Sequence, residues 1–402
     1  MAGLQAIELE GYRSIRAARV ELGAINVLIG ANGAGKSNLL GALGLLAAIA
    51  DRRLQLHVGQ RGGAERLLRF GRKVTERIRL GVDLGGAFYE AILAPTGEDA
   101  LIFEEELAWL GVPPRSRALQ GLPAALDDAL PRGHVLGAGG HRESAIGVNK
   151  PRPGAGGIVS TGYAFSTRTG DAIAGGVVDP AAIAPVLDGV QGRAVFHFHD
   201  TTALGPLTRS QDVHDAHALR RSGENLAPVL LGLSARAPGA YRRIVEAVRA
   251  VAPYFDDFVL APSEVNPDVM ALQWRHVEHE APFPAAALSD GTLRFICLAT
   301  LLLQPEPPAT ICIDEPELGL HPFAIHYLMG LVRAAAARTQ IVLATQSVTL
   351  LDEADPADVI VADLADGGSR FQRLDLAALA AWRAEYSLGQ LWRKNVLGGG
   401  PA

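Results

Sequence analysis

Hydrophobic and polar residues alternate along the first quarter of the chain with the period of two that is typical of β-strands. Residues 4–9 and 18–29 read as strands, and the apolar run 25–29 leads directly into a glycine. Gly-Gly and Pro-Thr-Gly turns separate three further segments of the same kind. These segments, residues 78–83, 88–93 and 101–107, predict an antiparallel β layer.

The last third of the chain alternates helical patterns with short apolar segments. This alternation indicates a mainly parallel sheet with helices on both faces. Helices are predicted at 290–303 and 322–338, and buried strands at 310–313, 340–344 and 358–362. In the middle, a strand is expected at 194–199 and helices within about 211–252, whereas the Gly-, Pro- and Ala-rich residues 111–175 predict long surface loops.

Composition points to a globular protein with a large core. Hydrophobic residues make up 49% of the 402 residues and charged residues 20%. The longest apolar run, residues 39–50, is too short to span a bilayer, and no signal peptide is visible. Cys297 and Cys312 both lie in apolar segments, so we expect reduced thiols and a cytoplasmic location without a membrane.

Charge is distributed unevenly. The net charge is −6, yet residues 51–80 contain nine Arg or Lys and only three Asp or Glu. A surface built from residues 52–79 would suit the phosphates of DNA. Alternatively, these cations pair with acidic groups elsewhere or cover a helix face.

Residues 30–37 read Gly-Ala-Asn-Gly-Ala-Gly-Lys-Ser and match a phosphate-binding loop in full. The preceding strand and a helix predicted from Lys36 to about Ala50 are the context that such a loop requires. Glycine turns allow backbone N–H groups to face phosphates, Lys36 would contact the β and γ phosphates, and Ser37 would bind Mg²⁺. The predicted nucleotide-binding residues here are Asn32, Gly33, Gly35, Lys36, Ser37 and Asn38.

Two carboxylates follow the apolar strand at 310–313. Asp314 fits the role of a Mg²⁺ ligand, and Glu315 that of the base that orients or deprotonates the attacking water. The alternative is that both acids merely end a strand and cap the next helix. After the next strand, Gln346 is expected near the γ-phosphate, unless it belongs to an ordinary strand-end turn.

The segment Leu288-Ser289-Asp290-Gly291 begins a predicted helix and offers a second anion site. Ser289 and Gly291 provide a hydroxyl and free backbone N–H groups at a helix N-terminus. A chain with a complete phosphate loop does not need a second cradle for the same ATP. We therefore expect these residues to complete the ATP site of a second copy, which predicts a homodimer in the ATP state.

The other candidate residues give weaker indications of a catalytic or binding role. His197 and His199 alternate on a strand but lack further spaced metal ligands. Residues 276–280 do not have the order of a zinc-protease motif, and the aromatic tail 386–392 is typical of core packing. Arg13 would reach a phosphate or simply pack.

Taken together, these segments resemble the ATP-binding-cassette ATPases, and within them the RecF/SMC-like group. More narrowly, they are similar to stand-alone ATPases related to the ATPase half of OLD-type nucleases. The resemblance rests on Gly30–Asn38, Leu288–Gly291 and Asp314–Glu317, and Gly319–Pro322 resembles the family's dimer-contacting loop. It implies ATP and Mg²⁺ as ligands and two copies closing around two nucleotides.

Three departures from the family pattern bear on function. Gln346 stands where the wider superfamily has histidine, which bears on hydrolysis. Gln60 and Asp200 are the candidates for the glutamine of the lobe-joining loop. No acidic cluster resembling a Toprim nuclease follows residue 360, so any nuclease would be a separate polypeptide.

We therefore predict an α/β P-loop ABC-ATPase fold with a mainly parallel core sheet, an antiparallel β layer and an inserted helical lobe carrying the signature segment. Residues 1–200 and 306–402 would form the ATP-binding lobe, and 201–305 the inserted lobe. The predicted activity is an ATP-driven switch in repair, chromosome maintenance or anti-phage defence. The alternatives are a slow or inactive ATPase that acts as an ATP-dependent scaffold for a separate effector, and a transporter ATPase subunit.

Overall fold

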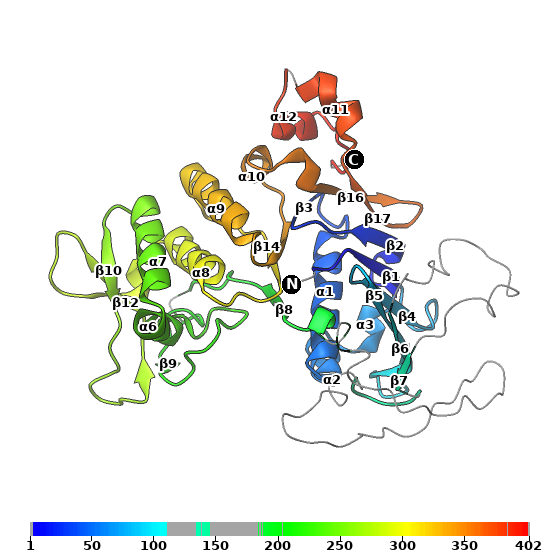
Figure 1. Cartoon of the computed structure of the whole chain (residues 1–402), viewed down its shortest axis with the longest axis horizontal. Helices are drawn as coiled ribbons and strands as arrows, with labels where there is room; N and C mark the ends of the chain where they lie inside the picture. Colours follow the sequence, from blue (N-terminus) through cyan, green and yellow to red (C-terminus); the bar gives the residue numbers. More distant parts are fainter. Residues whose placement is uncertain are drawn as a thin grey trace, which may run out of the picture.

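The computed structural model describes residues 3–110, 134–137, 139–144, 188–202, 204–383 and 385–400, together with Ala184 and Val186. Within these ranges the strands form two six-stranded sheets and two small sheets. Some helices lie between and around the large sheets, and others lie in the parts of the chain that protrude from them (Figure 1).

The first large sheet is antiparallel, as the alternation of its residues predicts. Its strands lie in the order β2-β1-β4-β5-β6-β7. Their bounds are Ala6–Tyr12 for β1, Ile15–Glu21 for β2, Ile78–Asp83 for β4, Ala87–Pro95 for β5, Leu101–Leu110 for β6 and His134–Gly137 for β7.

The second large sheet is parallel apart from one edge strand. Its order is β17-β16-β3-β15-β14-β8, with β17 antiparallel to β16. The strands are β3 (Ile25–Ile29), β8 (Arg193–Phe196), β14 (Thr310–Asp314), β15 (Gln340–Ala344), β16 (Val359–Ala365) and β17 (Gly368–Arg373). The carboxyl ends of β3, β14 and β15 are therefore side by side, at one edge of the sheet.

Alternate residues of the parallel sheet face two different cores. Leu28 and Val342 pack with helix α1 (Lys36–Ala50) and the antiparallel sheet. Val27 and Leu343 pack in the core that contains α8 (Asp290–Leu303) and α9 (Pro322–Ala335). Helix α1 thus lies between the two sheets, while α8 and α9 cover the far face (Figure 1).

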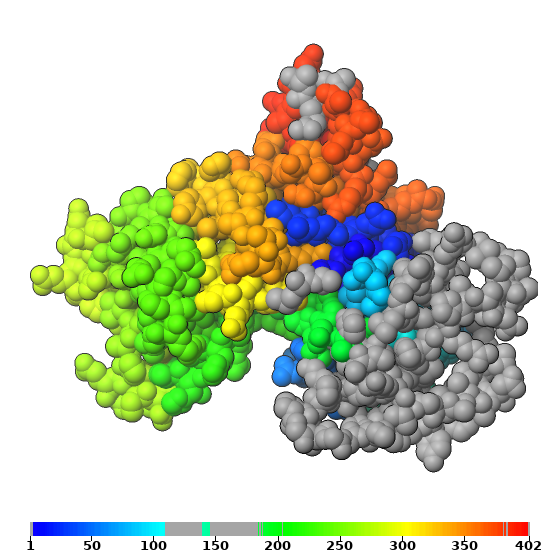
Figure 2. Space-filling view, viewed as in Figure 1, coloured from blue at the N-terminus to red at the C-terminus, as the bar shows by residue number. Residues whose placement is uncertain are grey.

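The remaining elements extend from this body in two directions. Residues 204–290 protrude on one side, coloured green in Figure 2, and the C-terminal residues protrude elsewhere, coloured red. The green group contains α6 (Leu226–Arg236), α7 (Pro238–Val251), β9 (Gln211–Asp212), β10 (Phe255–Val259), β11 (Val269–Met270), β12 (Gln273–His276), β13 (Phe283–Pro284) and η2 (Ala285–Ala287). The smaller remaining helices are α2 (Leu54–Gln60), α3 (Ala64–Leu67), α10 (Val348–Asp352), η3 (Pro356–Asp358), α11 (Leu376–Arg383) and α12 (Leu388–Arg393).

Two sequence predictions need correction. Residues 18–29 contain the end of β2 and all of β3, which belong to different sheets. The chain turns at Gly23, whose N–H and C=O both bond the side chain of Asn26. Residues 211–225 are not helical, because the Asn225 side chain holds this stretch in turns by bonding the backbone of Asp215, Ala218 and Arg220.

Most other element predictions agree with the structure. The helices at 36–50 and 290–303 and the strand at 340–344 have the expected bounds. Helix α9 ends at Ala335, three residues earlier than expected, and β8 ends at Phe196 rather than 199. The surface loops expected at 111–175 lie outside the described residues, except for 134–137 and 139–144.

Candidate functional site

The predicted phosphate loop joins β3 to the N-terminus of α1. Gly30, Gly33 and Gly35 have φ angles of 154°, 82° and 111°, which favour glycine. A Cβ at Gly35 would overlap the side chain of Ser369, and one at Gly30 would overlap the carbonyl oxygen of Ala362. The glycines are therefore required both by the turn and by the close approach of β16 and β17. Asn32 and Gly33 are exposed at the top of the loop.

Lys36 is buried beneath this loop. Its Nζ donates hydrogen bonds to the carbonyl oxygens of Gly30 at 2.6 Å and Ala31 at 3.1 Å. Burial lowers the pKa of Lys36, while the charges of Asp314, Glu315 and Glu317 act in the opposite direction. Three carboxylates thus lie close enough to stabilise the lysine charge inside the protein.

Ser37 and Asp314 meet at the edge of the parallel sheet. Ser37 is the second residue of α1, and its hydroxyl donates to Oδ2 of Asp314, the last residue of β14, over 3.0 Å. A hydroxyl oxygen beside a carboxylate oxygen is a donor set suited to Mg²⁺, which prefers oxygen ligands. The two residues that we predict as metal ligands are therefore brought together.

Glu315 and Gln346 form a second pair beside the first. The side-chain amide of Gln346 donates to Oε1 of Glu315 over 2.8 Å. Glu315 adopts a left-handed conformation with φ 47°, which few residues other than glycine adopt, and its N–H bonds the Ala344 carbonyl. An amide of this kind can orient a carboxylate, but it cannot transfer a proton.

Side chains from distant segments support the start of α1. Asn38 donates to the hydroxyl of Ser14 at 2.6 Å, and the hydroxyls of Ser14 and Ser369 are also 2.6 Å apart. Arg13, which we expected to reach a phosphate or to pack, donates to Oδ1 of Asn38 at 3.3 Å. The sequence analysis missed Ser14 and Ser369, because isolated serines in turns carry no signal of their own.

The segment around Ser289 has a local role that the structure makes clear. Ser289 is the N-cap of α8, and its hydroxyl accepts the Thr292 N–H at 3.1 Å. Gly291 lies against the loop that follows β14, and a Cβ there would overlap the carbonyl oxygen of Gly319. Within the described residues, neither Ser289 nor Gly291 hydrogen-bonds to residues 30–38.

Arg294, five residues beyond Ser289, connects α8 to two other segments. Its guanidinium donates to the carbonyl oxygens of Phe198 at 3.0 Å, His199 at 2.9 Å and Leu318 at 2.8 Å. The first two follow β8 and the third follows β14, so one side chain fixes the start of α8 against both strand ends. Sequence reasoning did not identify this role.

The remaining candidate residues have no contact with the phosphate loop among the hydrogen bonds of the described residues. Gln60 is exposed at the end of α2, and the Asp200 carboxylate accepts from Thr202 in its own turn. The rings of His197 and His199 are 6.0 Å apart, and burial lowers the pKa of His197. Among the described residues no group of three His, Cys, Asp or Glu side chains is arranged to hold a metal.

The cations of residues 52–79 divide into two groups. Arg79 is tied to Glu8, Glu10 and Glu90. Arg72 pairs with Glu65 at 3.0 Å, and Arg77 with Glu104 at 3.5 Å. The alternative of pairing with acidic groups is therefore correct for these three. Arg52, Arg53, Arg66 and Lys73 are exposed, and the Phe70 side chain of the same segment is 70% exposed.

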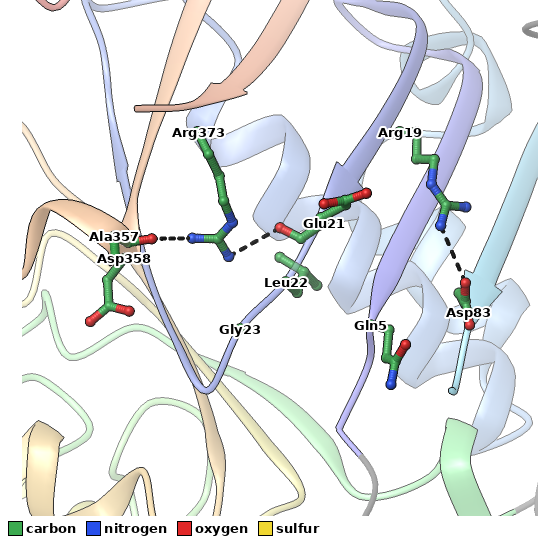
Figure 3. A pocket seen from close by; sticks show the side chains of 9 residues that line it. All are labelled: Gln5, Arg19, Glu21, Leu22, Gly23, Asp83, Ala357, Asp358 and Arg373. Atoms are coloured by element: carbon green, nitrogen blue, oxygen red, sulfur yellow. Dashed lines mark hydrogen bonds and ion pairs between the residues drawn. The ribbon is translucent and has the colours of Figure 1, made fainter. Parts of the chain in front are cut away.

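A shallow cavity of about 490 Å³ lies away from the phosphate loop (Figure 3). Arg373 lines it and donates to the carbonyl oxygens of Ala357 and Glu21, while Arg19 pairs with Asp83. None of its lining residues belongs to the phosphate loop or to the two pairs described above, so the cavity is not part of the candidate site. In the described part of the chain, no helix is both long and apolar enough to cross a membrane.

Comparisons with known proteins agree with this geometry. A family model described as "AAA domain, putative AbiEii toxin, Type IV TA system" matches residues 25–117 and 196–352. No curated protein matches the chain.

Solved structures show the fold. The chain is similar to the Smc head bound to the C-winged helix domain of ScpA, with a TM-score of 0.54 at 13% identity over 94% of this chain and 99% of that one. A Smc head domain with an extended coiled coil, bound to the C-terminal domain of ScpA and derived from Pyrococcus furiosus, gives 0.53 at 14% identity over 96% and 99%. The architecture is thus an SMC-head-like α/β fold, with parallel and antiparallel sheets.

Proposed function

The chain belongs to the AAA-domain ATPase family whose model matches residues 25–117 and 196–352, and we propose that it binds Mg-ATP and hydrolyses it to ADP and phosphate. The observation that carries the proposal is the meeting of two pairs at one sheet edge. Ser37 contacts Asp314 and Gln346 contacts Glu315. Gln346 follows β15, the neighbour of β3, and Asp314 ends β14, the next strand beyond β15.

The phosphate loop would bind ATP through its backbone and Lys36. N–H groups around Asn32, Gly33 and Gly35 would face the phosphates, and the Asn38 side chain would support this turn. The Lys36 ammonium donates to two loop carbonyl oxygens. Phosphate oxygens would replace these acceptors and would stabilise a lysine charge that burial disfavours.

Ser37 and Asp314 are the residues that would hold Mg²⁺. When bound, the ion supplies positive charge that offsets the negative charge of the phosphates. Both side chains offer oxygen, and their hydrogen bond keeps them at the same point of the sheet edge. To hold the ion, the Asp314 carboxylate would give up the hydrogen bond from Ser37. The Ser37 hydroxyl would keep its proton and offer an oxygen lone pair to the ion.

Glu315 would act as the base. Its carboxylate would orient the attacking water and accept a proton as the water oxygen bonds the γ-phosphorus. The bond from the γ-phosphorus to the bridging β-phosphate oxygen would break, and ADP would leave. Gln346 would hold the carboxylate by donating to Oε1, leaving Oε2 for the water. Because the Gln346 amide neither gains nor loses a proton near neutral pH, proton transfer would depend on Glu315 alone.

We further propose that two copies close head-to-tail around two ATP molecules. Ser289 and Gly291 of one copy would contact the γ-phosphate held by Lys36 of the other, at the positive end of α8. Leu318 and Phe323, 42% and 52% exposed, flank the loop at Gly319–Pro322 and would be covered by the partner. In this proposal residues 1–200 and 306–402 form the ATP-binding lobe, and 201–305 the lobe that carries Ser289.

A second candidate function is a slow ATPase that serves as an ATP-dependent scaffold. Gln346 favours it, since an amide beside Glu315 can orient the carboxylate but cannot relay a proton. Its effector would be a separate protein, such as a Toprim-type nuclease or a toxin. The family description, which names a toxin of a type IV system, supports a defence setting for either version.

DNA is the proposed trigger, through a smaller surface than the whole of residues 52–79. Arg79, Arg72 and Arg77 are occupied by carboxylates, which leaves the exposed Arg52, Arg53, Arg66 and Lys73 for phosphates, and of these we choose Arg66 and Lys73 for the test. Replacing both with glutamate should weaken DNA binding and reduce its salt dependence. Glutamate at the paired Arg77 is the matched control.

Phosphate release tests the activity. Glu315→Gln should lower kcat by about 10² or more while the protein still binds ATP, and Lys36→Ala should lose ATP binding. Glu353→Gln, a carboxylate that contacts His326 away from the site, is the control and should behave as the wild type. Equal phosphate release from the wild type and from Glu315→Gln, both with ATP bound, would favour the scaffold.

A further inference from the structure

Glu317 is a carboxylic acid beside the candidate site with no role in the proposed reaction. It lies two residues after Glu315 and is partly buried. Its Oε1 accepts the Thr345 hydroxyl at 2.5 Å, whereas its Oε2 is buried without a hydrogen-bond partner. Such an orphaned oxygen is costly, so a reason for the carboxyl group is needed.

Thr345 links this carboxyl to the end of β15. The residue is fully buried, and its N–H bonds the carbonyl of Leu28 at 2.9 Å on the neighbouring strand. Its hydroxyl oxygen also accepts the Ser347 N–H at 2.9 Å, and Ser347 caps α10. Thr345 therefore holds the turn between β15 and α10 through three hydrogen bonds, and Glu317 is the side chain that accepts from its hydroxyl.

Gln346 occupies the middle of that turn. It lies between Thr345 and Ser347, and its amide donates to Oε1 of Glu315 at 2.8 Å. Glu315 and Glu317 belong to one loop, while Thr345 and Gln346 belong to another. Two parallel contacts thus join the loops: Glu315 with Gln346, and Glu317 with Thr345.

We propose that Glu317 is a positioning residue, which acts through the Thr345 hydroxyl to hold the Gln346 amide against the carboxylate of Glu315. This inference rests on the proposed ATPase function and adds a residue to it. Glu317 does not touch the nucleotide in this account, and it accepts no proton from the attacking water. Its contribution is to keep one oxygen of Glu315 oriented and the other free.

Electrostatics agrees with a placement close to the reacting groups. Burial raises the pKa of Glu317, the Thr345 hydroxyl and the backbone of Glu317 and Gln346 act in the opposite direction, and the charge of Glu315 adds to the rise. Glu317 in turn lies close enough to Lys36 to favour its charge. The carboxyl thus lies within the electrostatic environment of the proposed γ-phosphate position, although its hydrogen bond is to Thr345 in the turn between β15 and α10.

Four variants distinguish a positioning role of Glu317 from a general loss of folded structure. Glu317→Ala removes the acceptor, and Thr345→Val removes the donor at nearly the same volume. Glu317→Gln keeps a carbonyl oxygen for Thr345, and Thr345→Ser keeps the hydroxyl. We expect Glu317→Ala and Thr345→Val each to lower kcat by about 10-fold to 100-fold, with KM for ATP unchanged. The two conservative variants should retain activity within a few-fold.

The double variant gives the sharper result. If Glu317 acts only through Thr345, Glu317→Ala combined with Thr345→Val should lower kcat no further than either change alone. Two losses that multiply in the double variant would overturn the proposal. So would a rise in KM that matches the fall in kcat.

A second readout does not depend on hydrolysis. In protein with ¹⁵N-labelled glutamine side chains, the Gln346 amide resonance, assigned by its loss in Gln346→Ala, should shift in Glu317→Ala and Thr345→Val. It should stay in place in Glu317→Gln and Thr345→Ser. An unmoved resonance in the first pair would overturn the proposal, even if the wild type released no phosphate. Absent phosphate release with the expected shifts would instead contradict the proposed ATPase activity.

Discussion

Gly291 at the start of α8 lies directly against the carbonyl oxygen of Gly319, in the loop between β14 and α9. The contact joins the proposed trans-acting segment to the segment that follows the proposed base. It also gives Gly291 a local reason to be glycine, independent of any nucleotide. The two roles of this residue can be separated by experiment.

Gly291→Ala should disturb this contact and weaken ATP-dependent dimerisation, because the new methyl group forces α8 and the loop apart. Binding of ATP to the monomer should be unchanged, since the phosphate loop is elsewhere. Gly330→Ala is the control: its Cβ would meet nothing within 4 Å, and alanine within α9 should stabilise the helix by about 0.5–1 kcal/mol. Light scattering and nucleotide titration measure both effects, and an unchanged dimer in Gly291→Ala would contradict the account.

Arg294→Ala should reduce the affinity of the ATP-bound dimer more than it reduces ATP binding by one copy. It removes three hydrogen bonds that fix α8 to the ends of β8 and β14. Arg294→Lys should recover only part of the loss, because an ammonium group lacks the fork of the guanidinium. Arg333→Ala, which removes a hydrogen bond from a guanidinium on α9 to the carbonyl oxygen of Glu353 at the end of α10, provides the comparison. Equal dimer affinities in the two alanine variants would argue against a coupling role.

Lys36→Met should abolish ATP binding and yet raise the melting temperature of the nucleotide-free protein. Burial lowers the pKa of Lys36, so the unfolded state holds the proton more tightly than the folded state. Stability is therefore lost as pH falls below the unfolded pKa, and removing the amine relieves that loss at neutral pH. Differential scanning fluorimetry at neutral pH tests this. A lower melting temperature in Lys36→Met would show that the neighbouring carboxylates outweigh burial.

His57→Gln should flatten the dependence of stability on pH. Burial lowers the pKa of His57 to about 4, and Arg61, Arg221 and Arg13 add to the shift. Between pH 6.5 and 4 the unfolded chain binds a proton that the folded chain refuses, so stability falls as pH falls. At pH 5 this contribution amounts to about 2 kcal/mol relative to pH 7.5.

Urea unfolding at pH 7.5 and pH 5 measures the difference. The wild type should lose more stability than His57→Gln over this interval. Replacement of the exposed His217 by glutamine serves as the control. Identical losses in the wild type and in His57→Gln would place the pH sensitivity in other groups.

The sequence predicts the parallel sheet and the residues at its edge because both depend on local patterns. A polar residue after an apolar run, as at Asp314 and Gln346, marks the end of a strand, and in a parallel sheet these ends lie side by side. The pairing of Ser37 with Asp314 then follows from topology. The bounds of α8 were predictable for a similar reason, since Ser289 is an N-cap and apolar residues follow with helical period.

Contacts between distant segments were not predictable in this way. Ser14 and Ser369 form a hydrogen bond although they are 355 residues apart, and no sequence pattern around either serine predicts the other as its partner. The role of Arg294 depends on three carbonyl groups, which every residue has. The helical pattern expected over about 211–252 fails at 211–225, where a single side chain, Asn225, stabilises turns instead.

The central claim is that ATP joins two copies through Ser289, and size-exclusion chromatography with light scattering tests it most directly. In the Glu315→Gln background, Mg-ATP should convert the monomer into a dimer. The further change Ser289→Arg should abolish that dimer while each copy still binds ATP. A dimer that forms equally with and without Ser289→Arg, or a protein that stays monomeric with ATP bound in Glu315→Gln, would contradict the account.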